Sequence, residues 1–425
     1  LLAGFAAGNG GGQAKGGGQR RDPAEMLGRG DDLDAGCGKG GPEGGDRAVE
    51  DRNTGEGPEL LWEARAGPRA LAGGDHEDGD GVRPGHGARS HERLGPCKAS
   101  AIHPATAKPG PRPLPSRTPV PSTLWPDETG VPVYLAPMSG LTDRAFRRIA
   151  RRFGASMVVS EMVASDRLAS GAEDEIAKCD NDTPGAPIVV QLAACDPRWI
   201  REAAIRAEGG GASAIDINMG CPAKRVVGGL AGSALMRDIA HAATLIRAVV
   251  EAVRVPVSVK MRLGWDDRTR NALTLARVAE DIGVRLVSVH GRTRCQFYTG
   301  RADWDAVGEV VQGVSIPVLV NGDIADAASG VAALAQSGAA GLMIGRSAIG
   351  RPWLLGQVRS RLEGTAYAEP DRAAKYAAMI EHLDLSASLY GARRGVLKFR
   401  THLAAYLKGL GVSPAEISAL CQVDD

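Results

Sequence analysis

The sequence lacks most of the features that mark a secreted, metal-binding or membrane protein. Its seven cysteines are scattered and contain no Cys-x-x-Cys pair, which argues against a disulfide framework or a zinc ribbon and for a reducing compartment. No apolar run approaches the ~18–20 residues that span a bilayer. The apolar start has no basic region before it, so neither a signal peptide nor a twin-arginine signal is predicted. We therefore expect a cytoplasmic protein without a membrane segment.

The net charge and the spacing of potential metal ligands exclude few further classes of protein. The net charge of +1 predicts no partner by itself. The sequence has no His-x-x-x-His or His–carboxylate spacing, so we expect no metal site. Nothing in the sequence gives an oligomeric state, and a monomer is the simplest expectation.

Residues 1–125 differ in composition from the rest of the chain. They contain Gly-Gly-Gly runs at 10–12 and 16–18, mixed charged clusters and a proline-rich stretch at 104–121. Periodic apolar residues are almost absent, so this segment buries too little apolar surface to offset its chain entropy. We expect a disordered, low-complexity extension, and a nucleic-acid-binding arm is the alternative interpretation.

From residue 133 onward, short β-branched apolar runs alternate with helix-like stretches. The runs are Val133–Met138, Ser156–Glu161, Ile188–Leu192, Ala214–Asn218, Val257–Met261, Leu286–His290, Val318–Asn321 and Gly341–Gly345. The clearest helical stretches are Arg198–Ala207, Ile239–Val253, Arg270–Asp281 and Ala325–Gln336. This alternation indicates a parallel sheet covered by helices.

The number of these units predicts an α/β fold of the (β/α)8 barrel (TIM barrel) type, which usually takes ~250 residues. We place this domain at residues 126–362. An open doubly wound sheet is the alternative, but no Gly-x-Gly-x-x-Gly follows the first strand, which disfavours it.

Residues 363–425 predict a small C-terminal helical domain. Pro370 and Asp371 form a helix start signal, and apolar residues then recur at helical spacing. Five basic residues of this region predict a basic helical face, and a solvated surface is the plainer interpretation. They are Arg393, Arg394, Lys398, Arg400 and Lys408.

Function in such barrels gathers at the carboxyl ends of the strands, and here those ends carry polar or special residues. They are Pro137-Met138-Ser139, Glu161, Gln191, Asn218 with Cys221, Lys260 with Arg262, His290 with Arg292, Asn321-Gly322-Asp323 and Gly345-Arg346. The last two groups follow strands seven and eight, whose loops often bind phosphate. Glycine exposes backbone N–H groups and arginine forks onto phosphate oxygens, so they predict a phosphate site.

Lys260 has three possible roles. It could form a Schiff base, act as a fixed cation opposite a cofactor ring, or pair with a carboxylate such as Glu161. His290 begins a His-Gly-Arg-Thr-Arg segment at a strand end, which is more typical of a binding residue than of a structural histidine.

Cys221 lies between a flexible glycine and a rigid proline, directly after a buried strand. It could act as a nucleophile with a neighbouring base, or as a general acid, because a thiol with the ordinary pKa of about 8.5 is mostly protonated at neutral pH. A buried structural thiol is the third interpretation, and the loop setting disfavours it.

Together these residues form a pattern found in one family. The chain from about Val133 to Gly409 closely resembles the tRNA-dihydrouridine synthases, in particular their bacterial B-type (nitrogen-regulation-like) branch. The motifs that carry the resemblance are Ala136-Pro137-Met138-Ser139-Gly140-Leu141-Thr142-Asp143, Asn218-Met219-Gly220-Cys221-Pro222-Ala223-Lys224, Val259-Lys260-Met261-Arg262, His290-Gly291-Arg292-Thr293, Asn321-Gly322-Asp323-Ile324, Gly345-Arg346 and Tyr406-Leu407-Lys408-Gly409.

The resemblance implies an FMN-dependent reductase that uses NADPH, or alternatively NADH, to convert a uridine of tRNA into 5,6-dihydrouridine. Hydride would pass from the reduced flavin to C6 of the base, and Cys221 would give a proton to C5. By position, the resemblance implies flavin contacts from Pro137, Met138, Ser139, Gln191, Lys260, His290, Asn321, Gly322, Asp323, Gly345 and Arg346. It implies substrate contacts from Asn218, which would hold the uracil, and from Arg294, Arg393, Arg394, Lys398, Arg400 and Lys408.

The helical region ends soon after Gly409, so the resemblance also implies a shortened tRNA-binding domain at 363–425. Three other classes stay open on the residues alone. They are an FMN barrel oxidoreductase acting on a small enone or pyrimidine, a Schiff-base lyase centred on Lys260, and a non-catalytic tRNA-binding or regulatory protein.

Overall fold

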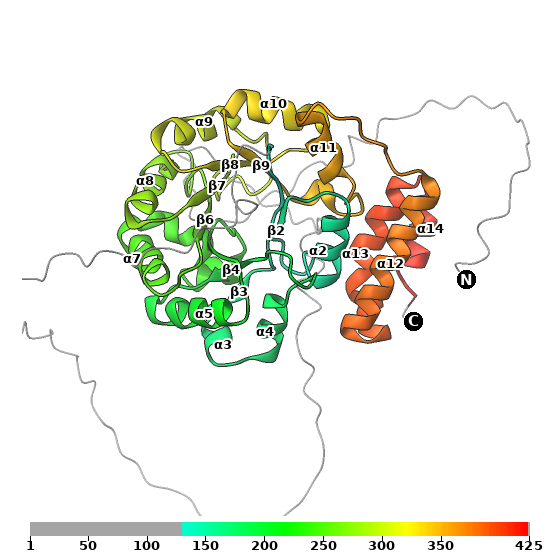
Figure 1. The fold of residues 1–425 in the computed structure, drawn as a ribbon, viewed down its shortest axis with the longest axis horizontal. Helices are drawn as coiled ribbons and strands as arrows, with labels where there is room; N and C mark the ends of the chain where they lie inside the picture. The colour runs from blue at the N-terminus through cyan, green and yellow to red at the C-terminus, as the bar shows by residue number, and fades with distance from the viewer. Residues whose placement is uncertain (1–129, 424–425) are drawn as a thin grey trace, which may run out of the picture. The chain divides into compact units, whose positions relative to one another are not determined.

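The computed structural model describes residues 130–423. The extension expected at 1–125 lies outside the described residues. Within them, a parallel barrel is ringed by helices, and a further group of helices follows it in the chain (Figure 1).

The strands of the described residues form one parallel sheet. They are β1 (Val133–Leu135), β2 (Met157–Val158), β3 (Val163–Ala164), β4 (Val189–Ala193), β5 (Ala214–Met219), β6 (Val257–Arg262), β7 (Leu286–His290), β8 (Val318–Asn321) and β9 (Gly341–Ile344). Their order is β2-β1-β9-β8-β7-β6-β5-β4-β3. A parallel bridge links Val159, just after β2 at one end of this order, to Val189 in β4, the strand that pairs with β3 at the other end. The sheet therefore closes, and the predicted (β/α)8 barrel is confirmed.

The second barrel strand is interrupted, which the sequence did not predict. The expected run 156–161 appears as β2, and residues 159–162 separate it from β3. At this break the Ser160 hydroxyl accepts a hydrogen bond from the backbone N–H of Gln191 at 2.9 Å. A side chain thus replaces one backbone partner of the sheet.

Alternate residues of each strand point into the barrel or toward the helices, as the pleat requires. Buried residues that pack together inside the barrel include Tyr134, Met157, Val189, Ala214, Leu286, Leu319 and Met343. Steps of two residues lead from Ala214 to Asn218 in β5, and from Leu286 to His290 in β7. Asn218 and His290, the polar residues at these strand ends, therefore lie on the same inner face as the apolar residues Ala214 and Leu286.

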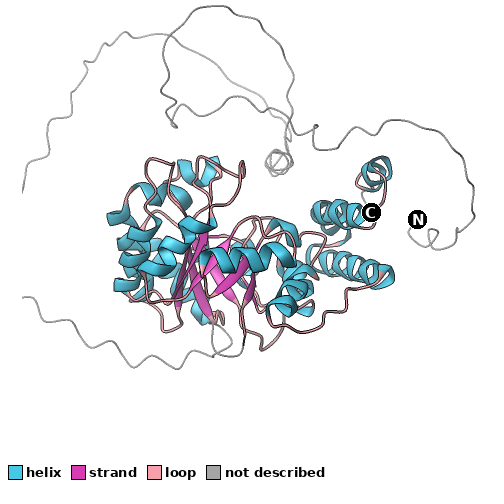
Figure 2. Cartoon of the chain, turned by 90° about the horizontal axis from the view of Figure 1, so that it is seen from above, coloured by secondary structure: helices cyan, strands magenta, loops and turns pink. Residues whose placement is uncertain are grey.

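Helices cover the outer face of the sheet (Figure 2). They are α2 (Arg144–Arg152), α3 (Ser165–Ala169), α4 (Glu173–Cys179), α5 (Pro197–Gly209), α7 (Ile239–Val250), α8 (Ala272–Ile282), α9 (Trp304–Gly313), α10 (Ala327–Ser337) and α11 (Leu354–Leu362). The loop after β5 contains the short helices α6 (Lys224–Gly228) and η4 (Gly232–Arg237), and the loop after β9 contains η5 (Arg346–Ala348). The predicted helices correspond to α5, α7, α8 and α10. Aspartates cap several of them through backbone N–H groups, as Asp196 does for α5 and Asp326 for α10.

The C-terminal region is helical, as predicted. It consists of α12 (Arg372–Tyr390), α13 (Ala392–Gly409) and α14 (Pro414–Leu420), so helical structure extends beyond Gly409. An apolar cluster that includes Trp353, Met379, Phe399 and Tyr406 joins α12 and α13 to the segment before α11. No helix among residues 130–423 has the length and apolarity needed to cross a bilayer.

Candidate active site at the strand ends

The loop after β5 holds Cys221 by its backbone. The amide oxygen of Asn218 accepts hydrogen bonds from the backbone N–H of Gly220 at 3.2 Å and of Cys221 at 2.9 Å. The carbonyl oxygen of Cys221 accepts from Ser233 in η4, through its hydroxyl at 2.8 Å and its N–H at 3.1 Å. The thiol-bearing residue is therefore fixed on both sides of its Cα and remains partly exposed.

Arg262 ties this loop to the one after β7. Its side chain is buried, and its Nε donates to the carbonyl oxygen of Gly220 at 2.8 Å. Its Nη1 donates to the carbonyl oxygens of Thr293 at 2.9 Å and Phe297 at 2.7 Å. Because a guanidinium has five donors in a rigid plane, one side chain can hold two loops in register.

Lys260 is the strand neighbour of Asn218. Burial and the nearby charge of Arg262 lower the pKa of Lys260 to about 8, although Asp216 and Cys221 oppose the shift. Within the described part of the chain, its ammonium group makes no hydrogen bond or ion pair. The pairing with Glu161 considered above is not found among the described residues, and Glu161 instead accepts a hydrogen bond from the N–H of Gly140 at 2.6 Å. Lys260 thus presents a desolvated cation at the barrel mouth.

A line of buried hydrogen bonds runs beneath Cys221. The amide oxygen of Gln191 accepts from Asn218 Nδ2 at 2.8 Å, and Gln191 Nε2 donates to Asp216 Oδ2 at 2.7 Å. The hydroxyl of Ser258 donates to Asp216 Oδ1 at 2.6 Å. Burial raises the pKa of Asp216, while its hydrogen bonds and Lys260 oppose the rise. The sequence reading did not include Asp216 among the site residues.

His290 ends β7 and is held neutral. Burial, followed by the charges of Arg262, Lys260, Arg292 and Arg346, lowers its pKa well below the usual range. Gly322 packs against its ring: a Cβ there would lie 2.8 Å from His290 Cδ2, and the φ of Gly322 is +116°. Glycine is needed at this position for both reasons.

Asp323 supports the rim through its carboxylate. Its Oδ2 accepts from Arg292 Nη2 and from the N–H of Ala302, each at 2.7 Å. Arg292 is buried and also donates to the carbonyl oxygens of Thr299 and Gly300. The structure therefore places the Asp323 carboxylate in an ion pair that shapes the loop at 299–302. The flavin contact expected of this residue stays a prediction.

The loops after β1 and β9 meet. A Cβ at Gly345 would lie 3.6 Å from the Met138 sulfur, so the absence of a side chain at 345 leaves room beside Met138. The guanidinium of Arg346 is exposed and lies 4.0 Å from the centroid of the Tyr298 ring, with Arg262 5.4 Å from the same centroid. The expected phosphate-binding segment is thus cationic and open.

The remaining β1 and β8 residues also lie at this end of the barrel. Pro137 and Ser139 flank Met138 and are partly buried. Asn321 is buried and donates from Nδ2 to the carbonyl oxygen of Met343 at 2.8 Å.

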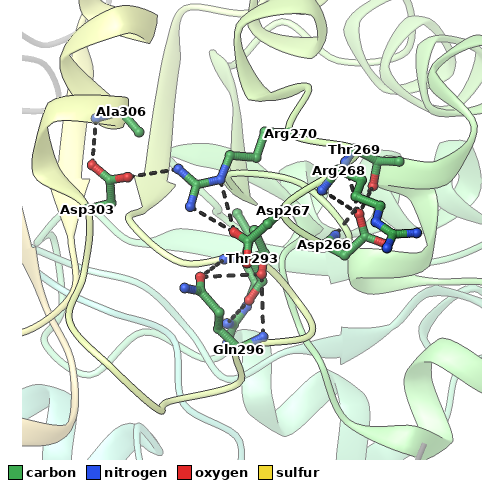
Figure 3. Close-up of polar contacts among 10 residues, drawn as sticks. Asp266, Asp267, Arg268, Thr269, Arg270, Thr293, Gln296, Asp303 and Ala306 are labelled. Atoms are coloured by element: carbon green, nitrogen blue, oxygen red, sulfur yellow. Dashed lines mark hydrogen bonds and ion pairs between the residues drawn. The ribbon is translucent and has the colours of Figure 1, made fainter. Parts of the chain in front are cut away.

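Arg294 lies in an aromatic setting at the rim. It is buried, and its guanidinium lies 4.6 Å from the ring centroid of Trp265 and 4.9 Å from that of Phe297. The adjoining loop, residues 266–270, is braced by Arg270, which forms ion pairs with Asp267 and Asp303 (Figure 3). Arg294 is therefore packed among aromatic rings, and its substrate contact stays a prediction.

The expected basic face of the C-terminal helices is divided. Arg393, Arg394 and Lys408 are exposed. Lys398 lies 4.5 Å from the ring centroid of Tyr390, at the end of α12. Arg400 instead donates from Nη2 to the carbonyl oxygen of Val423 at 3.0 Å, so it faces the end of the chain.

The fold and the site define a (β/α)8-barrel enzyme, and comparison with known proteins places it in a family. The family model described as dihydrouridine synthase (Dus) matches residues 134–418. A probable tRNA-dihydrouridine synthase of Rickettsia conorii is 50% identical over 283 residues, which cover 65% of this chain and 85% of the relative. A tRNA-dihydrouridine synthase B of Xanthomonas axonopodis pv. citri is 43% identical over 277 residues, which cover 65% and 83%. The chain belongs to the dihydrouridine synthase family of oxidoreductases.

The described residues suit an anionic cofactor with a phosphate group. Lys260 supplies a desolvated cation, and Arg346 supplies an exposed one. Gly345 leaves space beside Met138. No cluster of three or more histidine, cysteine or acidic side chains suited to a metal ion occurs in the same residues.

Proposed function

We propose that the protein reduces specific uridines of tRNA to 5,6-dihydrouridine, with FMN as cofactor and NADPH as the electron donor. NADH is the alternative donor. The observation that carries the proposal is the placement of Cys221 at the barrel mouth, with its backbone fixed by Asn218 and Ser233. This placement combines a side chain that carries a proton, Cys221, with the cationic side chains of Lys260 and Arg262 beneath it.

The proposed cofactor contacts are the eleven strand-end residues that the family resemblance implies. Lys260 and Gln191 would face the ring system, and Gly345 and Arg346 would hold the phosphate, because arginine and glycine N–H groups are suited to anions. FMN supplies hydride chemistry when bound. The protein's own contribution is to orient the ring, exclude water and stabilise negative charge.

Cys221 is the proposed general acid. The C5–C6 bond of uracil accepts hydride poorly until negative charge developing toward C5 and O4 is stabilised. A thiol held at C5 supplies the proton as that charge develops, a contribution worth roughly 10²–10⁴-fold in typical cases. Asn218 would hold the uracil through the second hydrogen on its Nδ2, since the first is given to Gln191.

The base must leave its stack to reach this recessed site. We propose that residues 126–362 form the catalytic domain and residues 363–425 the tRNA-binding domain. In the latter, exposed Arg393, Arg394 and Lys408 would contact phosphates. The proposed location is the cytoplasm, where tRNA is processed, and the proposed state is a monomer.

The visible absorption spectrum of the purified protein tests this proposal. A flavin spectrum that bleaches with NADPH and recovers anaerobically when unmodified tRNA is added would support it. A flavin that bleaches but does not respond to tRNA would favour a reductase of small enones or pyrimidines. A protein that cannot be reconstituted with FMN would contradict the proposal and move attention to a Schiff base on Lys260.

A further inference from the structure

We propose that Asp216 is a positioning residue for Cys221 and that it acts through Gln191 and Asn218. The proposal rests on the role of Cys221 in the proposed function. The hydrogen bonds on which it is built join residues of the protein itself. Hydrogen exchange can therefore probe them without substrate turnover.

The line begins at two backbone groups whose roles are fixed. The N–H groups of Gly220 and Cys221 can only donate, so the Asn218 side-chain atom facing them must be its oxygen. The Asn218 nitrogen then faces Gln191 at 2.8 Å, which makes the Gln191 atom on that side an oxygen as well.

Asp216 accepts the last hydrogen bond of the line. With its oxygen turned to Asn218, Gln191 directs its nitrogen to Asp216 Oδ2, at 2.7 Å. Only an acceptor at position 216 can end this line without leaving a buried donor unpaired. A donor there would favour the flipped orientation of both amides and would set the Asn218 nitrogen against the two backbone N–H groups.

Asp216 places a carboxylate inside the barrel. It lies one inward-facing step below Asn218 in β5 and is buried. It borders a small cavity inside the barrel together with Tyr134, Ser288 and Met343. An apolar side chain would fill this layer without the cost of burying a carboxylate, so packing alone does not account for it.

The other contacts to the cysteine loop act on its carbonyl side. Arg262 holds the carbonyl oxygen of Gly220, and Ser233 holds that of Cys221. The Asn218 amide oxygen holds the N–H groups of both residues, and its orientation is set from Asp216. Losing that orientation would release the amide side of the loop while the carbonyl side stays held.

Hydrogen exchange of the full-length protein tests the inference at the affected bonds. Asp216→Leu should make the amides of Gly220 and Cys221 exchange about tenfold faster, the loss expected for one buried hydrogen bond. Asp216→Asn should keep their protection, because its oxygen can face Gln191 while its nitrogen donates to the Ser258 hydroxyl. Ser258→Ala should keep it too, since Asp216 Oδ2 still accepts from Gln191. The amides of β8 serve as the internal reference.

Two results would overturn the inference. One is unchanged exchange at Gly220 and Cys221 in Asp216→Leu. The other is faster exchange there in Asp216→Asn with β8 unaffected, because the negative charge and not the acceptor would then matter. If Asp216→Leu does not fold, Gln191→Met interrupts the same line one step further on and should give the same local loss.

Turnover provides a second readout. In Asp216→Leu, kcat should fall about tenfold while KM for tRNA changes little, since only the proton donor is displaced. Asp216→Asn should restore most of kcat. If Cys221→Ala retained full activity, the proposed role of Cys221 as proton donor would fail, while the exchange result would still decide the structural inference.

Discussion

The Nε atom of Arg262 donates a hydrogen bond to the carbonyl oxygen of Gly220 at 2.8 Å, next to the proposed proton donor. The same guanidinium reaches Thr293 and Phe297 across the barrel mouth. The loop that carries Cys221 and the loop after β7 are therefore parts of one structure, and substitutions in either should affect both.

Arg262→Met should destabilise the protein strongly. It leaves buried carbonyl oxygens of both loops without their donor, and each such group costs about 1–3 kcal/mol. We expect a loss of at least about 3 kcal/mol in the free energy of unfolding, measured by urea denaturation. Arg262→Lys should recover only part of it, because an ammonium group lacks the planar fork. Full stability in Arg262→Met would contradict this account.

Cys221→Ala should reduce dihydrouridine formation by about 10²–10⁴-fold, the usual contribution of a general acid. Flavin content and tRNA affinity should stay unchanged, since the residue is held by its backbone. The measurement is the yield of dihydrouridine in a single turnover, by mass spectrometry of digested tRNA. Cys195→Ala, which removes an exposed thiol, is the matched control and should leave the yield unaltered.

Gly322→Ala should be more damaging than Gly338→Ala. Both glycines have positive φ, at +116° and +64°, so both substitutions incur backbone strain. Only at 322 would the new methyl group also meet atoms of His290 and Ala302, each at 2.8 Å, whereas nothing lies within 4 Å of a Cβ at 338. We expect Gly322→Ala to lose about 1–3 kcal/mol more, in parallel urea titrations. Equal losses would argue against close packing on His290.

Acid should weaken the contact between α2 and the C-terminal helices. The rings of His382 and His402 lie 4.5 Å apart and both pack on Phe146. Burial lowers the pKa of His402 to about 4 and that of His382 well below 6.5. Because the folded-state pKa values lie below the unfolded ones, stability is complete above about pH 6.5 and falls as the pH drops toward 4.

For His402 alone, the free energy of unfolding should fall by about 3 kcal/mol between about pH 6.5 and pH 4. Melting temperatures between pH 7 and 4 measure it. His402→Gln should flatten the dependence, because glutamine does not titrate. A melting temperature that is independent of pH in the unsubstituted protein would contradict the assignment.

Arg393 and Arg394 should contribute to tRNA affinity through charge. Replacing both with alanine should weaken binding and reduce the dependence of log K on log salt concentration by about 1–2, measured by fluorescence anisotropy. Arg254→Ala, an exposed arginine just before β6 at the opposite end of the barrel, is the control and should have no effect. Equal effects of the two changes would remove α13 from the proposed interface.

The sequence predicted the barrel well because its signals are local. Apolar runs such as Val318–Asn321 and capped helices such as α10 are recognisable from neighbouring residues. The interruption between β2 and β3 was missed, because Ser160 replaces a backbone partner through a contact with Gln191, 31 residues away.

The prediction of the candidate site was limited in the same way, because local signals were recognised and long-range contacts were not. Positions such as Cys221 and Lys260 could be selected because strand ends meet at one face of a barrel. Their partners could not, since the roles of Arg262, Arg292 and Asp216 depend on contacts between separate loops and strands. Arg294 and Arg400 were predicted as substrate contacts, and only tertiary packing directs one to Trp265 and the other to Val423.

The interrupted second strand has a mechanical consequence. A closed barrel has no free edge. A seam with few hydrogen bonds between two strands can therefore open only if the strands on both sides of it move together. At the break between β2 and β3, the seam to β4 consists of the Val159–Val189 bridge and two hydrogen bonds of Ser160: its N–H donates to the carbonyl oxygen of Val189, and its hydroxyl accepts from the N–H of Gln191. It lies beside Glu161 and Gln191, on the side of the mouth nearest α2. We therefore expect local opening of the barrel to be greatest at this break, while the ladder from β5 to β9 stays rigid.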